Sequence, residues 1–173
     1  MRRPAPGWAR SPASERSADG MLTGDRLMTR IVLSADAGGT LLAHLQTVFP
    51  DEGCGLLVGQ RDDRGNIRVS AVVPSPNIAD DPSATFEIDP GLRLRTQRQA
   101  RETGDMIVGH FHSHPAGDPV PSATDRRRGA GEPELVWLIA GMRWGGVQGI
   151  AAWRLAADGG EPERLDLEIA DAE

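Results

Sequence analysis

One stretch of the sequence, GHFHSHPAGDPVPSATD at residues 109–125, gathers residue types that can bind a metal. It holds His110, His112 and His114 at alternate positions and ends with Ser122 and Asp125. Residues two apart in a strand point to the same face, so two of these imidazoles can reach one ion. Zinc binds neutral imidazole nitrogens and accepts a carboxylate, and its catalytic sites keep a fourth position for water. The stretch is therefore either a catalytic zinc site or a row of ordinary polar residues on one strand.

Asp125 is the candidate third ligand, eleven residues after His114. The Pro and Gly residues of PAGDPVP let the chain turn back, and a helix that begins near Ser122 places Asp125 one turn later. Two histidines at a two-residue spacing would, by themselves, favour structural histidines. Pro115, Ser122 and Asp125 at fixed offsets shift the balance toward a metal site.

The motif HSHP, followed after six residues by SATD, together with the upstream PDEGCGLLVG, resembles the JAMM (MPN-plus) zinc metallopeptidases. The pattern of that family is a Glu, then His-Ser/Thr-His, seven residues, a Ser, two residues and an Asp. Each element is present, and Glu52 supplies the first. The resemblance covers about residues 30–170. It implies an α/β domain of the α+β type: a mixed, largely antiparallel β-sheet flanked by two main helices and a short helix that carries the third zinc ligand.

The resemblance also implies a role for each motif residue. His112, His114 and Asp125 would bind one Zn2+ per chain, with water completing a tetrahedral site. Glu52 would act as general base toward that water and later protonate the leaving amine, and Ser122 would donate a hydrogen bond to the oxyanion. Zinc lowers the pKa of bound water from 15.7 to about 7, so a nearby carboxylate can accept its proton as the water attacks. Loss of an oxyanion donor costs about 2.7–4 kcal/mol in a comparable hydrolase.

Two nearby residues are expected to have other roles. His110 lies two residues deeper in the strand than His112, where a ligand would pull the ion away from solvent and from Glu52. We interpret His110 as packing or as support for the ligands. Cys54 follows Glu52 by two residues and is expected to be a small buried side chain, with a zinc-bound thiolate as the alternative.

Two helices and about six strands are expected to position these residues. Apolar residues at helical spacing between Leu41 and Phe49 predict a helix that begins near Ser34 and ends before Pro50. CGLLVGQ and IRVSAVV, joined by the turn RDDRGN, predict a hairpin. TFEI predicts a short strand. DPGLRLRTQRQARETG predicts a second helix, with Asp89 as its cap and its end at Gly104 in the same segment.

The remaining elements surround the motif. MIVGHFH predicts a strand that leads into it, and SATDRRRGAG predicts a short helix. Three more strands are predicted from ELVWLIAG, VQGIAAWRL and RLDLEIA. Trp137 and Trp153 fall in these strands and are expected to pack in the core or at a sheet edge. The order of elements indicates a mixed sheet packed by helices.

Composition places limits on the function classes. The 173 residues suit a single domain over residues 28–173, and residues 1–27, which are rich in Arg, Pro, Ser and Gly, are expected to be a disordered tail. The single cysteine excludes an intrachain disulfide, and no stretch reaches the roughly 18 apolar residues needed to span a bilayer. We therefore expect a cytoplasmic protein without a membrane partner. The net charge of −6 argues against nucleic acid.

The JAMM family includes enzymes that remove ubiquitin and small bacterial enzymes that cut adducts or extensions from ubiquitin-like sulfur-carrier proteins. The short body, the segment TFEIDP and the ending through AAWRL resemble the bacterial subgroup. We therefore expect a peptidase or isopeptidase that cleaves after the Gly-Gly-like C-terminal tail of a ubiquitin-like or sulfur-carrier protein. A zinc hydrolase of a small-molecule amide or adduct is the alternative. A noncatalytic scaffold is disfavoured because the motif is complete.

Overall fold

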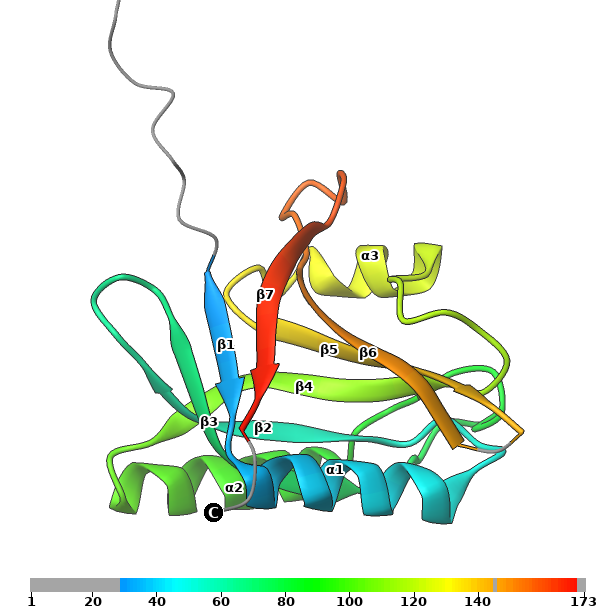
Figure 1. The fold of residues 1–173 in the computed structure, drawn as a ribbon, viewed down its shortest axis with the longest axis horizontal. Coiled ribbons are helices and arrows are strands. Elements are labelled where there is room, and N and C mark those ends of the chain that lie inside the picture. The colour runs from blue at the N-terminus through cyan, green and yellow to red at the C-terminus, as the bar shows by residue number, and fades with distance from the viewer. Residues whose placement is uncertain (1–28, 145, 171–173) are drawn as a thin grey trace, which may run out of the picture.

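A computed structural model describes residues 29–144 and 146–170 of the chain (Figure 1). The predicted tail, residues 1–27, lies outside the described residues, and its disorder stays a prediction. The elements follow one another as β1 (Arg30–Leu33), α1 (Ala35–Val48), β2 (Cys54–Arg61), β3 (Ile67–Ser75), α2 (Pro90–Glu102), β4 (Met106–His114), α3 (Ala123–Gly129), β5 (Val136–Arg143), β6 (Gly146–Arg154) and β7 (Glu163–Ile169). Figure 1 shows α1 and α2 along one side of the strands and α3 on the opposite side.

The strands form a closed barrel in the order β1-β3-β2-β4-β5-β6-β7. Four of the pairings are antiparallel, while β1 pairs in parallel with both β3 and β7, and β4 pairs in parallel with β5. The prediction of a mixed, largely antiparallel sheet with two main helices and one short helix is confirmed. Closure into a barrel was not predicted, because it depends on β1, a four-residue strand that is too short to show a period.

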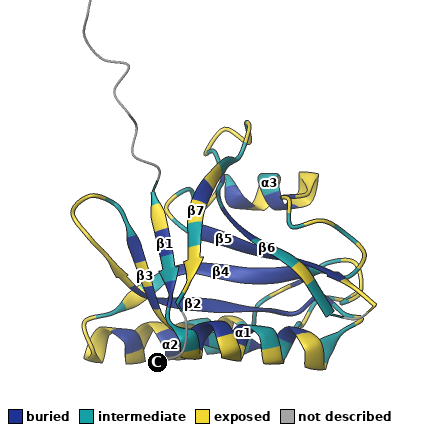
Figure 2. Cartoon of the chain, viewed as in Figure 1, coloured by how far each residue is buried: buried dark blue, intermediate teal, exposed yellow. Residues whose placement is uncertain are grey.

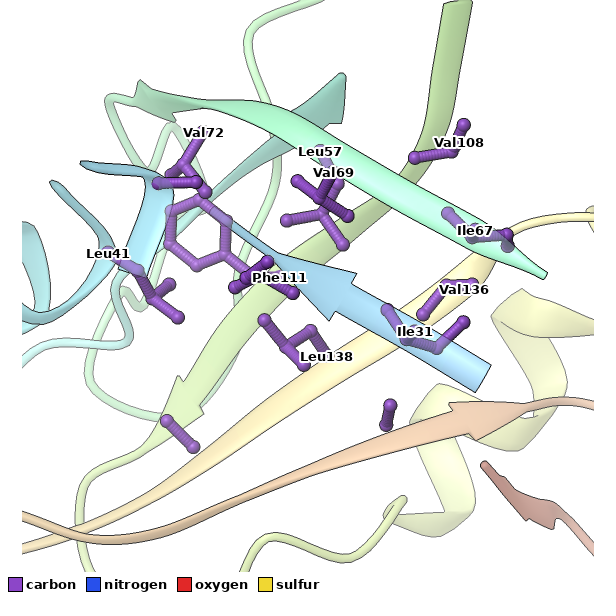
Figure 3. Packing of buried hydrophobic residues seen from close by; sticks show 14 of the residues in the cluster. Ile31, Leu41, Leu57, Ile67, Val69, Val72, Val108, Phe111, Val136 and Leu138 are labelled. Atoms are coloured by element: carbon purple, nitrogen blue, oxygen red, sulfur yellow. The ribbon is translucent and has the colours of Figure 1, made fainter. Parts of the chain in front are cut away.

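Helix α1 begins where the sequence predicts, because the side chain of Ser34 accepts a hydrogen bond from the backbone N–H of Ala37 at 3.2 Å. Its buried residues Leu41 and Leu45 pack into the same core as the inward faces of the strands. Figure 3 shows the Phe111 ring of β4 at the centre of this core, close to Leu41. One face of β4 is therefore committed to the interior of the barrel.

The opposite face of β4 looks outward, toward α3. His110 and His112 are buried there beside a second, smaller cluster made up of Cys54, Phe86, Trp137 and Leu155. Figure 2 shows β2, β4 and β5 as the most continuously buried strands. The alternation of faces that the sequence predicts for this strand is therefore present.

Helix α2 also matches its predicted signals, with the Asp89 side chain capping the N–H of Gly91 at 2.8 Å. The predicted strand TFEI is wrong, because the segment forms only an isolated bridge between Ile88 and Asn77. The Asn77 side chain accepts from the N–H of Glu87 and donates to the carbonyl of Thr85. A side chain here provides the hydrogen bonds that a neighbouring strand would otherwise supply.

The two strand tryptophans pack as expected. Trp137 is 2% exposed, and Trp153 donates its indole N–H to the carbonyl of Pro119 at 2.9 Å. In the part of the chain that the structure describes, no helix has the length and apolar character required to cross a membrane.

Candidate metal centre

Three side chains converge at the end of β4 and the start of α3. The Nε2 atoms of His112 and His114 are 3.0 Å apart, and the Asp125 carboxylate oxygens lie 3.5 and 3.4 Å from them. A tetrahedral zinc ion with bonds of about 2.0–2.1 Å separates its ligand atoms by about 3.3–3.4 Å. Two imidazoles and one carboxylate at these separations fit zinc. Within residues 29–144 and 146–170, no other group of three or more His, Cys, Asp or Glu side chains is close enough to hold an ion.

Local structure holds Asp125 in place. The backbone N–H of Ser122 donates to Asp125 Oδ2 at 2.7 Å, and the backbone N–H of Asp125 donates to Ser122 Oγ at 3.1 Å. This reciprocal capping box starts α3 and aims the carboxylate at the two histidines. The Ser-x-x-Asp spacing therefore has a structural role as well as the chemical one that the resemblance implies.

Electrostatics favour an ionised Asp125 and a neutral His112 in this cluster. Burial favours the neutral form of Asp125, but its hydrogen bonds with His112 and His114 outweigh this effect and lower the pKa of the carboxyl. Burial lowers the pKa of the fully buried His112 and keeps its imidazole neutral. The Nδ1 atom of His114 donates to the carbonyl of Asp118 at 3.0 Å, which directs Nε2 toward Asp125. Burial lowers the pKa of His114, but its hydrogen bonds with Asp125 and Asp118 outweigh burial and raise it, so metal binding would displace a proton from Nε2.

Glu52 is brought to the cluster by the pairing of β2 with β4. Cys54 lies opposite His112 in this ladder. One step further along, the N–H of Gly53 donates to Ser113 Oγ at 2.8 Å, and the N–H of Ser113 donates to the carbonyl of Gly53 at 2.9 Å. Continuation of the antiparallel register places Glu52 opposite His114.

The Glu52 backbone is held on both sides. Its N–H donates to the carbonyl of Pro82 at 2.7 Å, and its own carbonyl accepts from the side chain of Asn77 at 3.0 Å. The side chain is 8% exposed, and burial raises the pKa of its carboxyl to about 7, although the charge of His114 opposes the shift. A carboxyl with this pKa can both accept and return a proton near neutral pH.

Ser122 is exposed at the start of α3, next to the buried Asp125. Its Oγ accepts the N–H of Asp125, so its own hydroxyl proton is left to donate. Of the five motif residues, His112, His114 and Asp125 meet directly, Glu52 lies across the strand pair, and Ser122 joins the group through Asp125.

Three further residues support the motif residues, and two of them, Phe86 and Asn77, were not predicted to do so. Phe86 stacks on the His112 ring with centroids 4.3 Å apart and planes at 18°. Ser113 and Asn77 both hold the peptide group that joins Glu52 to Gly53: Ser113 Oγ accepts its N–H, and the Asn77 side chain donates to its carbonyl. Ser113 lies between His112 and His114, so the alternation of the strand places it on the opposite face. Asn77 and Phe86 lie in the loop and the segment next to it, where no period indicates which way a side chain points.

His110 and Cys54 do not join the ligand group. The His110 ring lies 4.1 Å from the Trp137 ring and 5.9 Å from the Phe86 ring, and burial lowers its pKa to about 3. Cys54 is fully buried, and burial raises the pKa of its thiol to about 12, so the thiolate form is suppressed. Both positions agree with the interpretation as packing residues.

A comparison with protein families shows the family to which the chain belongs. Residues 34–156 match the family described as prokaryotic homologs of the JAB domain. The chain belongs to this JAB-domain family. The resemblance to a small prokaryotic JAMM-type protein is thereby confirmed.

Two relatives of this JAB-domain chain carry informative names. It is 41% identical over 115 residues to the desampylase of Haloferax volcanii, a match that covers 64% of this chain and 80% of that protein. It is 30% identical over 113 residues to the CysO-cysteine peptidase of Mycobacterium tuberculosis, covering 65% of this chain and 74% of the relative.

Solved structures agree with the family assignment. The JAB-domain chain superposes on the solution structure of a protein from Desulfitobacterium hafniense with a TM-score of 0.69 and 31% identity, covering 82% of this chain and 94% of the other. A second solution structure, from Salinibacter ruber, gives a TM-score of 0.59 at 32% identity over 78% of this chain and 88% of that one.

Proposed function

We propose that this chain is a zinc-dependent metallopeptidase that cleaves after the Gly-Gly-like C-terminal tail of a ubiquitin-like or sulfur-carrier protein. The observation that carries the proposal is the convergence of His112, His114 and Asp125, with Glu52 opposite His114. The names of the relatives, a desampylase and a CysO-cysteine peptidase, support a peptidase that acts on such conjugates.

His112, His114 and Asp125 would hold the zinc ion. Bound zinc supplies an acidified water as nucleophile and polarises the scissile carbonyl. Glu52 accepts a proton as the water attacks and returns it to the departing amine, and the burial of its carboxyl favours the protonated form that this return requires. Ser122 donates its free hydroxyl proton to the carbonyl oxygen as negative charge develops there.

Glycine residues before the scissile bond suit this arrangement. The two imidazoles and the carboxylate converge on one point, and the loop that holds Asn77 and Pro82 contacts the backbone of Glu52. A tail without side chains can bring its terminal carbonyl close to such a point. Both a peptide bond and an isopeptide bond present the same acyl group, so either can be cleaved.

The test uses a ubiquitin-like carrier protein ending in Gly-Gly, fused to a reporter or linked to a lysine side chain. Zinc-loaded protein should release the partner, a chelator should stop the reaction, and added zinc should restore it. Replacement of the Gly-Gly by Ala-Ala should slow cleavage strongly. Glu52→Gln, loaded with zinc, is the inactive control. Intact fusions in the presence of zinc-loaded wild-type protein would reject the proposal, and cleavage only of small amides would favour a small-molecule hydrolase.

A further inference from the structure

A pocket of about 430 Å³ lies beside the metal centre, on the same outward face of β4. Its apolar walls include Phe86 and Ile88, from the segment before α2, and its base includes His110 and Trp137. Phe86 is shared with the metal centre, because its ring also stacks on His112. The pocket is therefore the next depression along the strand from the candidate ligands.

The rings at the base of the pocket carry two polar atoms without partners. His110 and Trp137 are paired across β4 and β5, and they are 4% and 2% exposed. Neither His110 Nδ1 nor Trp137 Nε1 has a hydrogen-bond partner among the described residues. An indole N–H only donates, so an acceptor is required to satisfy it. Buried polar groups in folded proteins are nearly always satisfied, so an acceptor, either a water molecule or a polar group of a ligand, is expected here.

Arg128 is the charged group at the pocket that can pair with a negatively charged acceptor. Arg128 lies over the Phe86 ring at 5.6 Å and donates to the carbonyl of Phe86 at 2.6 Å, with no ion-pair partner within the described residues. Arg93 is paired with Glu132, and Glu87 is exposed at the rim. One guanidinium group is thus left available to a carboxylate in the pocket.

The direction of the substrate follows from the position of Glu52. Glu52 lines a separate pocket of about 420 Å³ on the β2 side, together with Asp51 and Asn77. Since Glu52 is proposed to protonate the leaving amine, the leaving group occupies that side. The acyl portion, which is the carrier tail, therefore extends the other way along β4, past His112 toward His110.

Spacing identifies the tail residue that reaches the pocket. His110 precedes His112 by two strand residues, or roughly 6.6 Å. In an extended tail that ends in Gly-Gly, the residue before the two glycines lies at the same separation from the glycine at the cleaved bond. Its side chain is the first one available to enter the pocket.

Resting on the proposed function, we propose that this pocket binds the side chain of the residue that precedes Gly-Gly, and that it selects Asp or Glu there. Trp137 Nε1 and His110 Nδ1 donate to the carboxylate, and Arg128 neutralises it. Phe86 and Ile88 enclose the methylene groups. A lysine or arginine at this tail position is disfavoured for two reasons. The positive charge of Arg128 repels it, and its side chain has no acceptor for the Trp137 N–H.

The first test compares carrier fusions that end in Asp-Gly-Gly, Ala-Gly-Gly and Lys-Gly-Gly. Wild-type protein should cleave the Asp form with kcat/KM roughly tenfold above the Ala form, and the Lys form should be slower than the Ala form. The Asp-to-Ala ratio should fall close to one in Arg128→Gln and should drop in Trp137→Phe. Arg127→Gln, which changes an exposed arginine of the same helix, should keep the wild-type ratio.

The second test reads binding without cleavage. In zinc-loaded Glu52→Gln protein, a peptide ending in Asp-Gly-Gly should shift the indole N–H resonance of Trp137, and one ending in Lys-Gly-Gly should not. Equal cleavage of all three fusions, or an indole resonance that neither peptide moves, overturns the pocket assignment and leaves the peptidase proposal standing. A shifted resonance without cleavage of any fusion overturns the peptidase proposal and leaves the pocket.

Discussion

The two halves of the outward face of β4 carry the same residue type in contrasting surroundings. At the end of the strand, His112 and His114 face the Asp125 carboxylate, and Glu52 lies across the ladder. Two residues earlier, His110 is enclosed by the rings of Phe86 and Trp137. The residue type is constant, so the neighbours determine which histidines can bind a metal.

The difference is supplied by elements remote from β4 in sequence. Helix α3 delivers a carboxylate to the end of the strand, and its capping box holds that carboxylate in place. Strand β5 delivers the Trp137 indole, opposite His110. A metal ligand set therefore forms only where α3 begins, and the aromatic half of the face is left to bind something else.

The largest expected effect is a difference in zinc content between variants of His112 and His110. His112→Ala removes one of three protein ligands, so the zinc content should fall from about one per chain to near zero, with loss of activity. His110→Gln is the matched change in the aromatic half and should retain about one zinc. Zinc analysis of both purified variants, with circular dichroism as the check of folding, measures the contrast. Equal loss of zinc from both variants would erase the distinction.

Glu52→Gln tests the proposed general base beside His112 and His114 without removing a metal ligand. The amide cannot accept the proton, so kcat should fall by about 10²–10⁴ while the zinc content stays at wild-type level. Asp63→Asn, the same change at an exposed residue of the β2–β3 turn, should have no effect. Normal turnover by Glu52→Gln would remove Glu52 from the reaction.

Ser122→Ala separates the two roles of this serine. Loss of the cap on the Asp125 N–H should lower the free energy of unfolding by about 0.5–2 kcal/mol. Loss of the oxyanion donor should lower kcat by about 10²–10³. Ser122→Thr keeps the hydroxyl and should stay close to wild type in both denaturant unfolding and kinetics. A stability loss without a kinetic loss would leave Ser122 with the capping role alone.

The last expected effect is a pH-dependent difference in the free energy of unfolding. Burial raises the pKa of Glu52 from 4.5 to about 7 in the folded, metal-free protein, so folding favours the protonated carboxyl. The contribution of Glu52 to the free energy of unfolding is fully present below pH 4.5 and is lost as the pH rises through 7. Metal-free Glu52→Gln should therefore match wild type at pH 4.5 and exceed it by up to about 3 kcal/mol at pH 8. Denaturant melts at both pH values measure this, and a difference that shrinks with rising pH would contradict the shift.

Helix positions could be predicted from the sequence because their signals are local. Ser34, Asp89 and Ser122 each cap the helix that follows, and α1 ends before Pro50. The strand period likewise placed His112 and His114 on one face. Glu52 was assigned from its motif position, and the β2–β4 register explains how a residue so far from His112 in the sequence comes to lie near the cluster.

The remaining features depend on contacts between distant segments. Strand β1 gains its structure from parallel pairing with β3 and β7, and β7 lies near the other end of the chain. The TFEI segment has the composition of a strand, but its backbone groups form hydrogen bonds with the side chain of Asn77. The Phe86 ring of the same segment stacks on His112. No local pattern marks such contacts, because each depends on where the barrel brings two segments together.

X-ray absorption at the zinc edge of the zinc-loaded protein tests the central claim most directly. The structure predicts two imidazole nitrogens and oxygen ligands at about 2.0–2.2 Å, with the same spectrum in His110→Gln. A third imidazole that disappears in His110→Gln, or a sulfur at about 2.3 Å from Cys54, would contradict the assignment of His112, His114 and Asp125 as the ligands.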